Sequence, residues 1–171
     1  MSKDLASRVA AIVRDAGGQV VGRTKLQKLT YLLVVSGLED DVRFLYKHYG
    51  PYSDFISTAA RDANLLGLLR EKEELASWGG TYSVYSVDSQ PGQDVPTARI
   101  ELASIAVAAD AVELELAATA LFLAKEGRGD AWLETERRKP EKAANGRLER
   151  AKALYQKLAE VVTPVRLPVL N

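Results

Sequence analysis

The sequence predicts a mainly helical α+β fold, with an N-terminal module that contains a β-hairpin and a C-terminal helical region. Apolar residues recur at spacings of three and four along most of the chain, which indicates amphipathic helices. Residues 69–87 instead have the pattern of two extended arms joined at Gly79-Gly80, as in a hairpin. Because three helices precede this hairpin, the order of elements is that of a winged helix, and we expect a winged-helix-like N-terminal module.

Composition places the chain among ordinary globular proteins, with 171 residues, 47% apolar and 27% charged. Lys and Arg number 23, as do Asp and Glu, so nucleic acid or an anionic membrane could be attracted only by a local patch. The absence of cysteine excludes disulfides and thiolate metal sites and suits a reducing compartment. The N-terminus has no apolar signal core, and the most apolar stretch, residues 112–124, is too short to span a bilayer. We therefore expect a cytoplasmic protein with no membrane partner.

Two helices open the N-terminal module, residues 1–88. The first covers residues 3–16 and ends at Gly17-Gly18, because glycine supplies the backbone freedom that a C-terminal cap requires. The second begins near Thr24, which fits a capping box with Gln27, since the hydroxyl and the amide can each satisfy a free backbone N–H. Leucines form its expected buried face: Leu26, Leu29, Leu32 and Leu33.

An aromatic segment separates the second helix from the third. Residues 41–49 are rich in strand formers and should be extended before a turn at Gly50-Pro51. Ser53 can cap the third helix, which runs to about Leu66. The side chains expected on its buried face are Phe55, Ile56, Ala59, Ala60 and Ala63.

The hairpin that follows consists of residues 69–75 and 81–87. Its Gly-Gly pair permits the positive backbone angles of a tight turn. The first arm is much more charged than the second, so we expect the first arm to be an exposed edge.

A polar linker at 88–96 leads to the C-terminal helical region, residues 97–162, which could pack as one domain with the first module. Residues 99–102 could alternatively form a strand. The tail, residues 163–171, has two prolines and is expected to be extended or disordered. Apolar helix faces could also pack on a second copy, so a homodimer stays open. The expected helices are 98–109, 111–125, a short one capped by Asp130, and 141–161.

Two segments resemble a known bacterial family. Gly22-Arg23-Thr24-Lys25-Leu26-Gln27-Lys28-Leu29-Thr30-Tyr31-Leu32 is similar to the K-L-Q-K-L-x-Y opening of the Panacea antitoxin domain, and His48-Tyr49-Gly50-Pro51-Tyr52-Ser53 is similar to the tyrosine-glycine-proline segment that follows it. Both segments also resemble the YwgA-like uncharacterised bacterial proteins, whose C-terminal part is likewise helical. The resemblance covers about residues 19–69. For Panacea proteins it implies an antitoxin, a toxin-neutralising partner or a proteolytic adaptor; for YwgA-like proteins it implies no established activity.

No catalytic residue, cofactor or metal site is expected, so we interpret the chain as non-enzymatic. His48 is the only histidine, and pairing it with Ser53 would require a third group to orient it, so we interpret His48 as a packed strand residue. The acidic runs at 39–41 and 71–74 lie in a loop and an exposed edge, where charges are usually solvated.

A protein-contact surface is the first functional hypothesis. Tyrosines surround Gly50-Pro51, and tyrosine offers a large contact area with a polar end. The alternatives are that the tyrosines pack on the core, and that Lys25, Gln27 and Lys28 cap the second helix or are solvated. The resemblance implies a toxin or a phage-related factor as the partner protein. The expected contact residues are Lys25, Gln27, Lys28, Tyr31, Tyr46, Tyr49 and Tyr52.

DNA binding by the winged-helix-like module is the alternative function, because one helix could enter the major groove while cations hold phosphates. Acidic residues argue against DNA binding: Asp54 and Asp62 on the third helix and the glutamates of the first hairpin arm. A wing that lies against phosphates is normally basic, because negative groups repel them. A second basic run, from Arg137 to Arg150, contains interspersed glutamates and is interpreted as a salt-bridged solvent face. The expected DNA contacts are Arg23, Lys25, Lys28, Lys47, His48, Ser57, Arg61 and Asn64.

Overall fold

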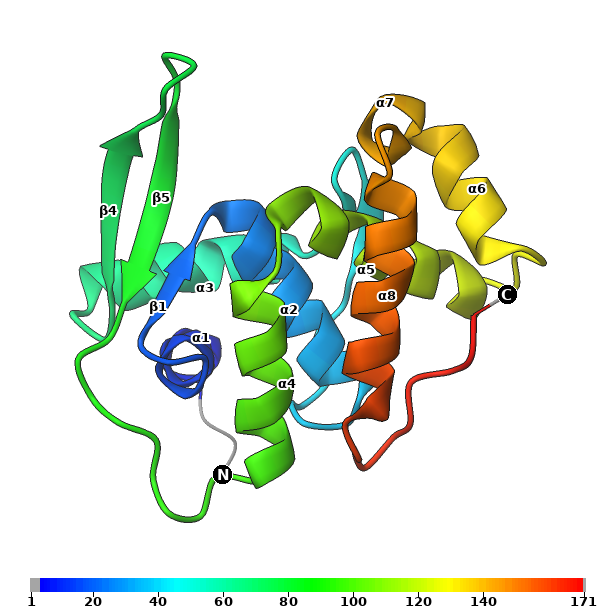
Figure 1. The fold of residues 1–171 in the computed structure, drawn as a ribbon. Coiled ribbons are helices and arrows are strands. Elements are labelled where there is room, and N and C mark those ends of the chain that lie inside the picture. The colour runs from blue at the N-terminus through cyan, green and yellow to red at the C-terminus, as the bar shows by residue number, and fades with distance from the viewer. Residues whose placement is uncertain (1–3, 171) are drawn as a thin grey trace.

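The computed structural model describes residues 4–170, in which helices predominate over two small sheets, so the mainly helical α+β class is confirmed (Figure 1). The N-terminal part contains α1 (Leu5–Asp15), β1 (Gln19–Val21), α2 (Arg23–Val35), β2 (Leu45–Lys47), β3 (Gly50–Tyr52), α3 (Asp54–Leu65), β4 (Arg70–Leu75) and β5 (Thr81–Ser86). The C-terminal part contains α4 (Thr97–Ala108), α5 (Ala111–Lys125), α6 (Ala131–Arg138), α7 (Pro140–Ala143) and α8 (Arg147–Glu160). None of the helices in residues 4–170 combines the length and the apolar character that a membrane span needs.

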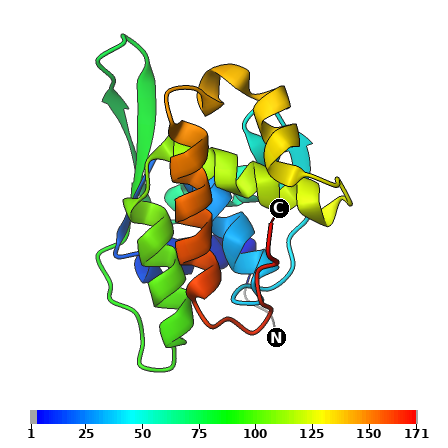
Figure 2. The same cartoon turned by 45° about the vertical axis from the view of Figure 1, so that its right-hand side comes forward.

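The larger sheet is antiparallel with strand order β1–β5–β4. The predicted hairpin is confirmed as β4 and β5, and its charged arm β4 is the edge strand as expected. The hairpin projects from the body of the molecule (Figures 1 and 2). Strand β1 was not predicted, because three residues between glycines are too few to show a strand period. It pairs Val20 with Tyr85, and both side chains are buried.

The smaller sheet is the β2–β3 hairpin, in which Tyr46 lies opposite Pro51. Its turn is at His48-Tyr49, so the predicted turn at Gly50-Pro51 is wrong. Proline can take part here because each strand of a two-stranded sheet is an edge. Gly50 has φ +88°, and a Cβ at this position would overlap the Thr119 hydroxyl of α5. Only glycine therefore allows this close approach of the hairpin to α5.

Two predicted helix caps are confirmed, and the one predicted for α2 is not. Ser53 caps α3, with its Oγ accepting from the N–H of Ile56 at 3.4 Å, and Asp130 caps α6. The predicted capping box of α2 is wrong, because the helix begins at Arg23 after Gly22. Its glutamine, Gln27, is buried and hydrogen-bonded elsewhere.

One hydrophobic core extends through the N-terminal and C-terminal parts, with α5 packed against α2, α6, α8 and β3. The predicted leucine face of α2 is buried, as is the predicted face of α3 except for Phe55, which is 58% exposed. Phe55 lies about 100° around the helix from Ile56, outside the row that faces the core.

One prediction for the C-terminal region, the continuous helix 141–161, is wrong, whereas the expected helix 98–109 and the extended alternative for the tail agree with the structure. Residues 99–102 belong to α4 and form no strand. The expected helix 141–161 is interrupted between α7 and α8, because Asn145 and Gly146 have φ of 61° and 79°. The tail is not disordered over residues 163–170, since Tyr155 donates to the carbonyl of Pro168 at 2.6 Å. The predicted start of the first helix at residue 3 lies outside the described residues.

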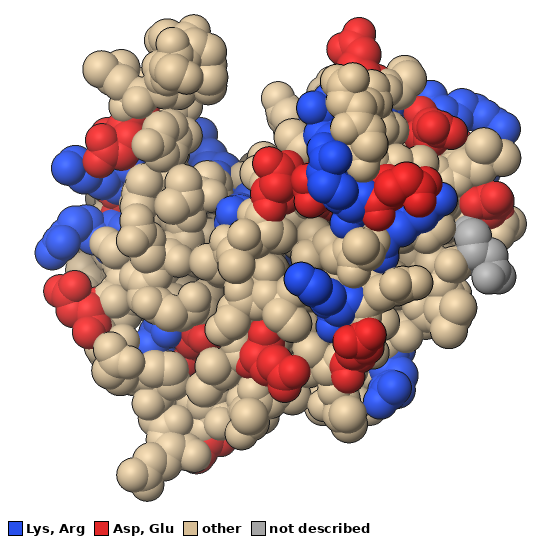
Figure 3. Space-filling model, in the orientation of Figure 1, with Lys and Arg blue, Asp and Glu red and all other residues tan. Residues whose placement is uncertain are grey.

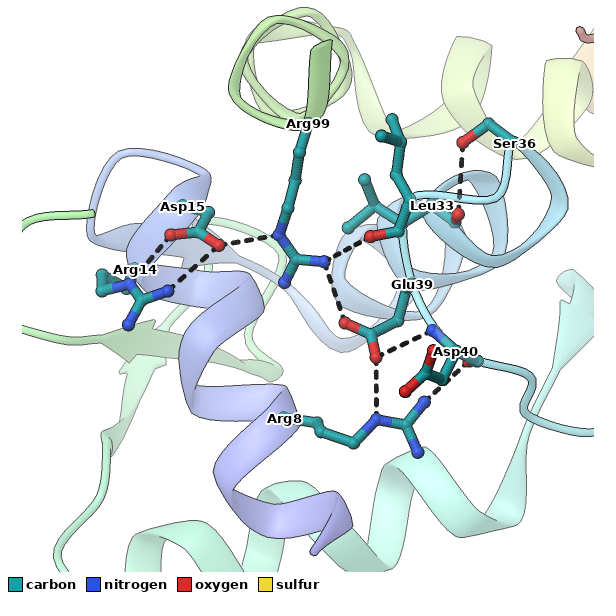
Figure 4. A network of polar contacts seen from close by, with 9 residues as sticks. Arg8, Arg14, Asp15, Leu33, Ser36, Glu39, Asp40 and Arg99 are labelled. Carbon is teal, nitrogen blue, oxygen red and sulfur yellow. Dashed lines mark hydrogen bonds and ion pairs between the residues drawn. The ribbon is translucent and has the colours of Figure 1, made fainter. Parts of the chain in front are cut away.

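A buried ion network joins α1, α4 and the loop after α2 (Figure 4). Arg99 of α4 donates from Nε to Asp15 at 2.7 Å and from Nη1 to Glu39 at 2.9 Å. Glu39 also accepts from Arg8 at 2.7 Å, and Arg14 pairs with Asp15 at 2.8 Å. Because buried charges require partners, this network fixes α4 against the N-terminal part.

Candidate functional site

Residues 22–32 and 48–53, the two segments that resemble a known family, contact each other in the structure, because side chains of α2 bind the backbone of β3 and Ser53. The Gln27 amide donates to the carbonyl of Ser53 at 3.0 Å and accepts from the Ser53 N–H at 2.9 Å. Lys28 Nζ donates to the carbonyl of Pro51 at 2.8 Å. Gln27 is 3% exposed and Lys28 is fully buried, so the expectation that these side chains form a contact surface is wrong. Both side chains instead bind backbone groups of Pro51 and Ser53 from the core side of the hairpin.

Lys28 lies close to a buried carboxylate. Burial lowers the pKa of Lys28 to about 7, while the negative charge of Glu115 on α5 favours the protonated form. Glu115 is 2% exposed, forms an ion pair with Lys139 Nζ at 3.0 Å and accepts from Lys142 Nζ at 2.7 Å. One buried carboxylate therefore anchors two lysines of the α6–α7 segment close to the hairpin.

A cleft of about 1110 Å³ lies between this hairpin and the α6–α7 segment. We call it the cationic cleft; residues 46–49 and 138–142 line it. Four of these side chains are cations and one, Glu141, is a carboxylate. Their partners Asp54, Glu115 and Glu134 bring the carboxylates to the same number as the lining cations, and two further cations beside them, Arg137 and the buried Lys28, leave the region with an excess of positive charge that attracts negative charge.

Cations of the α6–α7 segment lie over tyrosine rings of the hairpin. The guanidinium of Arg138 is 4.9 Å from the centre of the Tyr46 ring, and Lys142 Nζ is 4.3 Å from that of Tyr49. Lys139 Nζ donates to the carbonyl of His48 at 2.6 Å. Such contacts fix the rings and the cations relative to each other. Tyr49 remains 55% exposed and the Lys142 side chain 32% exposed, so a partner can reach both.

An apolar pocket of about 530 Å³ adjoins the cationic cleft. Aromatic rings of α2, the β2–β3 region and α5 form its wall: Tyr31 packs on Phe44 at 5.2 Å and on Phe122 at 6.0 Å between centroids. Tyr46 lies 5.9 Å from Phe122 and lines the cleft as well as the pocket. The two cavities therefore form one continuous surface.

The remaining expected contact residues lie apart from the cleft. Tyr31 is buried, and burial raises its pKa. Tyr52 is half-buried under Lys47, whose Nζ is 4.9 Å from the ring centre. Lys25 is half-buried and donates to the carbonyls of Val107 and Ala109 at the end of α4. Of the expected set, the cleft therefore contains Tyr46 and Tyr49.

Most of the residues expected to bind DNA are engaged in contacts within the protein. Lys25 and Lys28 are engaged as described, Arg23 is 3.6 Å from Glu71, and Lys47 pairs with Asp54 at 3.1 Å. Asn64 accepts from the N–H of Glu71 at 3.0 Å. Ser57 is half-buried, and Arg61 and His48 are exposed. The tip of the β4–β5 hairpin, residues 75–82, is uncharged, as seen at the upper left of Figure 3.

His48 and Ser53 do not form the pair considered from the sequence. The Ser53 hydroxyl is buried and caps α3, whereas His48 is exposed in the turn of the hairpin. The interpretation of His48 as a packed strand residue is therefore wrong. Over residues 4–170, no three His, Asp or Glu side chains come together in a way that could bind a metal ion.

Sequence analysis did not identify Arg138, Lys139 and Lys142 as site residues. The salt-bridged solvent face that we expected is present in part, because Arg138 pairs with Glu134 at 2.8 Å and Arg150 with Glu113 at 2.9 Å. Lys and Arg lie among Asp and Glu over α7 and the start of α8 (Figure 3). Lys139, however, is buried. The basic run itself was the only available signal, since its position beside the tyrosines depends on tertiary packing.

Comparison with known proteins does not assign this site. The Panacea-like and YwgA-like resemblance of the two motifs remains a prediction, although the hydrogen bonds between them give each motif a structural role. No protein-family model and no curated protein matches this chain.

Proposed function

We propose that this chain is a non-enzymatic protein-interaction module, antitoxin-like or adaptor-like, which binds a partner protein through the cationic cleft. The observation that supports this most is the exposed ring of Tyr49 with Lys142 over it, in a cleft that Arg138 also lines beside Tyr46. Tyrosine and arginine are the residue types most enriched where interfaces derive their binding energy.

Rigid support of the hairpin favours the same function. The side chains of Gln27 and Lys28 hold the backbone of β3 and Ser53 from within the core. Tyr46 and Tyr49 are therefore positioned before a partner arrives. Preorganisation of this kind reduces the conformational entropy that binding would otherwise remove.

The N-terminal part is winged-helix-like in our proposal, and DNA binding is the second candidate function. The element order α1–β1–α2–β2–β3–α3–β4–β5, in which the β2–β3 hairpin is inserted between two helices, and the sheet order β1–β5–β4 support the winged-helix assignment. The exposed side of α3 is unfavourable to DNA, because it presents Phe55, Leu65 and Asp62. An electrophoretic assay over a salt series tests this candidate; affinity should fall steeply with ionic strength, and no shift at low salt would exclude it.

Affinity purification of the full chain from its native cells tests the proposed function. The double variant Tyr49→Ala/Arg138→Ala removes the exposed part of the cleft, and Tyr82→Ala/Arg61→Ala is the matched control on exposed positions elsewhere. We expect a protein that wild type and control retain and that the cleft variant loses. A partner retained equally by all three chains, or none retained by any, contradicts the proposal. If the recovered partner is toxic to cells, co-expression with the wild-type chain should restore growth.

A further inference from the structure

The apolar pocket and the cationic cleft differ in charge but share Tyr46, and this combination defines the chemistry of a ligand. The four cations that line the cleft are equalled in number by Glu141 and by their partners Asp54, Glu115 and Glu134, and the additional cations Arg137 and Lys28 leave the region cationic. The side chains of Arg138 and Lys142 are 29% and 32% exposed, so further carboxylates can contact them. Acidic side chains of a partner are therefore favoured on this side of Tyr46.

On the other side of Tyr46, the wall of the apolar pocket is aromatic. Phe122 and Phe44 are only partly buried, and Phe122 lies 5.9 Å from Tyr46 and 6.0 Å from Tyr31. A large apolar side chain entering this pocket would remove exposed aromatic surface from water. The charged residues that line it are two carboxylates, Asp41 and Glu126, and one cation, Lys125, so this side has no excess of positive charge.

We infer that the partner of this site presents an acidic segment with an adjacent large apolar side chain, the carboxylates in the cationic cleft and the apolar group against Phe44 and Phe122. This inference rests on the proposed function. It names a peptide rather than a nucleic acid, because single-stranded nucleic acid requires cations along the whole groove to follow its phosphates. Here four cations line the cleft on one side of Tyr46, whereas the apolar pocket on the other side has one cation, Lys125, and two carboxylates.

A display library of random short peptides, screened against the full chain, tests the inference. Peptides retained by the wild type should be enriched in Asp or Glu next to Phe, Trp, Leu or Ile. Binding of a selected peptide, measured by fluorescence anisotropy, should weaken about tenfold in Arg138→Ala and in Phe122→Ala, as expected for central contact residues. Arg61→Ala serves as the control, and circular dichroism checks that each variant folds.

Exchanging single features of the selected peptide separates the two halves of the site. Replacing its acidic residues by Gln or Asn should abolish the effect of Arg138→Ala, and replacing its apolar residue by Ser should abolish that of Phe122→Ala. Enrichment of basic peptides, enrichment without charge preference, or no enrichment overturns the inference. Tighter binding of a poly-dT oligonucleotide, or self-association that Tyr49→Ala abolishes, also overturns it. The purification experiment is independent of these outcomes. It contradicts the proposed function only if the cleft variant retains every protein that wild type retains, or if wild type retains none.

Discussion

Replacing Gln27 by leucine removes the amide that pairs with both backbone groups of Ser53 at the start of α3. The Ser53 N–H donates to Gln27 at 2.9 Å within the core and would lose that acceptor. The Ser53 carbonyl would lose the Gln27 donor at 3.0 Å, but it would keep its helical hydrogen bond from Ser57 at 3.2 Å. The change therefore leaves one buried donor unsatisfied and removes one of two bonds to an acceptor.

The expected loss of unfolding free energy follows from these two contributions. A buried donor left without a partner is destabilising by about 1–3 kcal/mol, and the second lost bond adds about 1 kcal/mol. Leucine occupies a similar volume, so we expect no large cavity contribution. Gln27→Leu should thus reduce the free energy of unfolding by about 2–4 kcal/mol.

Urea unfolding followed by circular dichroism measures this loss. Gln156→Leu, at an exposed position of α8, is the matched control and should change the free energy by less than about 0.5 kcal/mol. Hydrogen exchange in Gln27→Leu should accelerate most in the β2–β3 hairpin, because its link to α2 is lost. If Gln27→Leu were as stable as Gln156→Leu, the proposed support of the hairpin by α2 would be refuted.

Three further perturbations test other parts of the structure. Because burial lowers the Lys28 pKa to about 7 from 10.5, the unfolded chain binds more protons between these values, and the free energy of unfolding should rise with pH by up to about 1.4 kcal/mol per unit. Lys28→Met should reduce this slope in urea unfolding from pH 7 to 9, and an unchanged slope would contradict the burial effect. Gly50→Ala combines a φ of +88° with overlap at Thr119 and should lower the free energy of unfolding by about 2 kcal/mol or more. Gly127→Ala is the control, because Gly127 has φ +83° but no atom near the position of the added Cβ, and it should lower the free energy of unfolding by only about 1 kcal/mol. Equal losses for the two variants in thermal unfolding would exclude an effect of the contact between Gly50 and α5. Arg99→Met removes one of the two arginines that pair with the 2%-exposed Asp15 and one of the two that pair with Glu39, and should lower the free energy of unfolding by about 3 kcal/mol. A loss no larger than that of the exposed-site control Arg61→Met would show that the network is dispensable.

Local features of the sequence determined most of the secondary structure. The leucine spacing of α2, the Ser53 and Asp130 caps, and the Gly79-Gly80 hairpin each depend on residues within a few positions of one another. Such short-range preferences act before tertiary contacts form, so they can be read from the chain alone. They fail where the local signal is brief, as in the three-residue strand β1.

The cationic cleft was decided by tertiary structure alone. Gln27 fits a capping box by spacing, yet its partner is Ser53, and Lys139 bonds the carbonyl of His48, 91 positions away. Only the packing of α5 between α2 and α6 brings these segments together. Sequence patterns describe which face of a helix is apolar, but the partner of a polar side chain depends on which distant groups the core places beside it. The tyrosines could therefore be identified from the sequence, whereas the cations that complete their site could not.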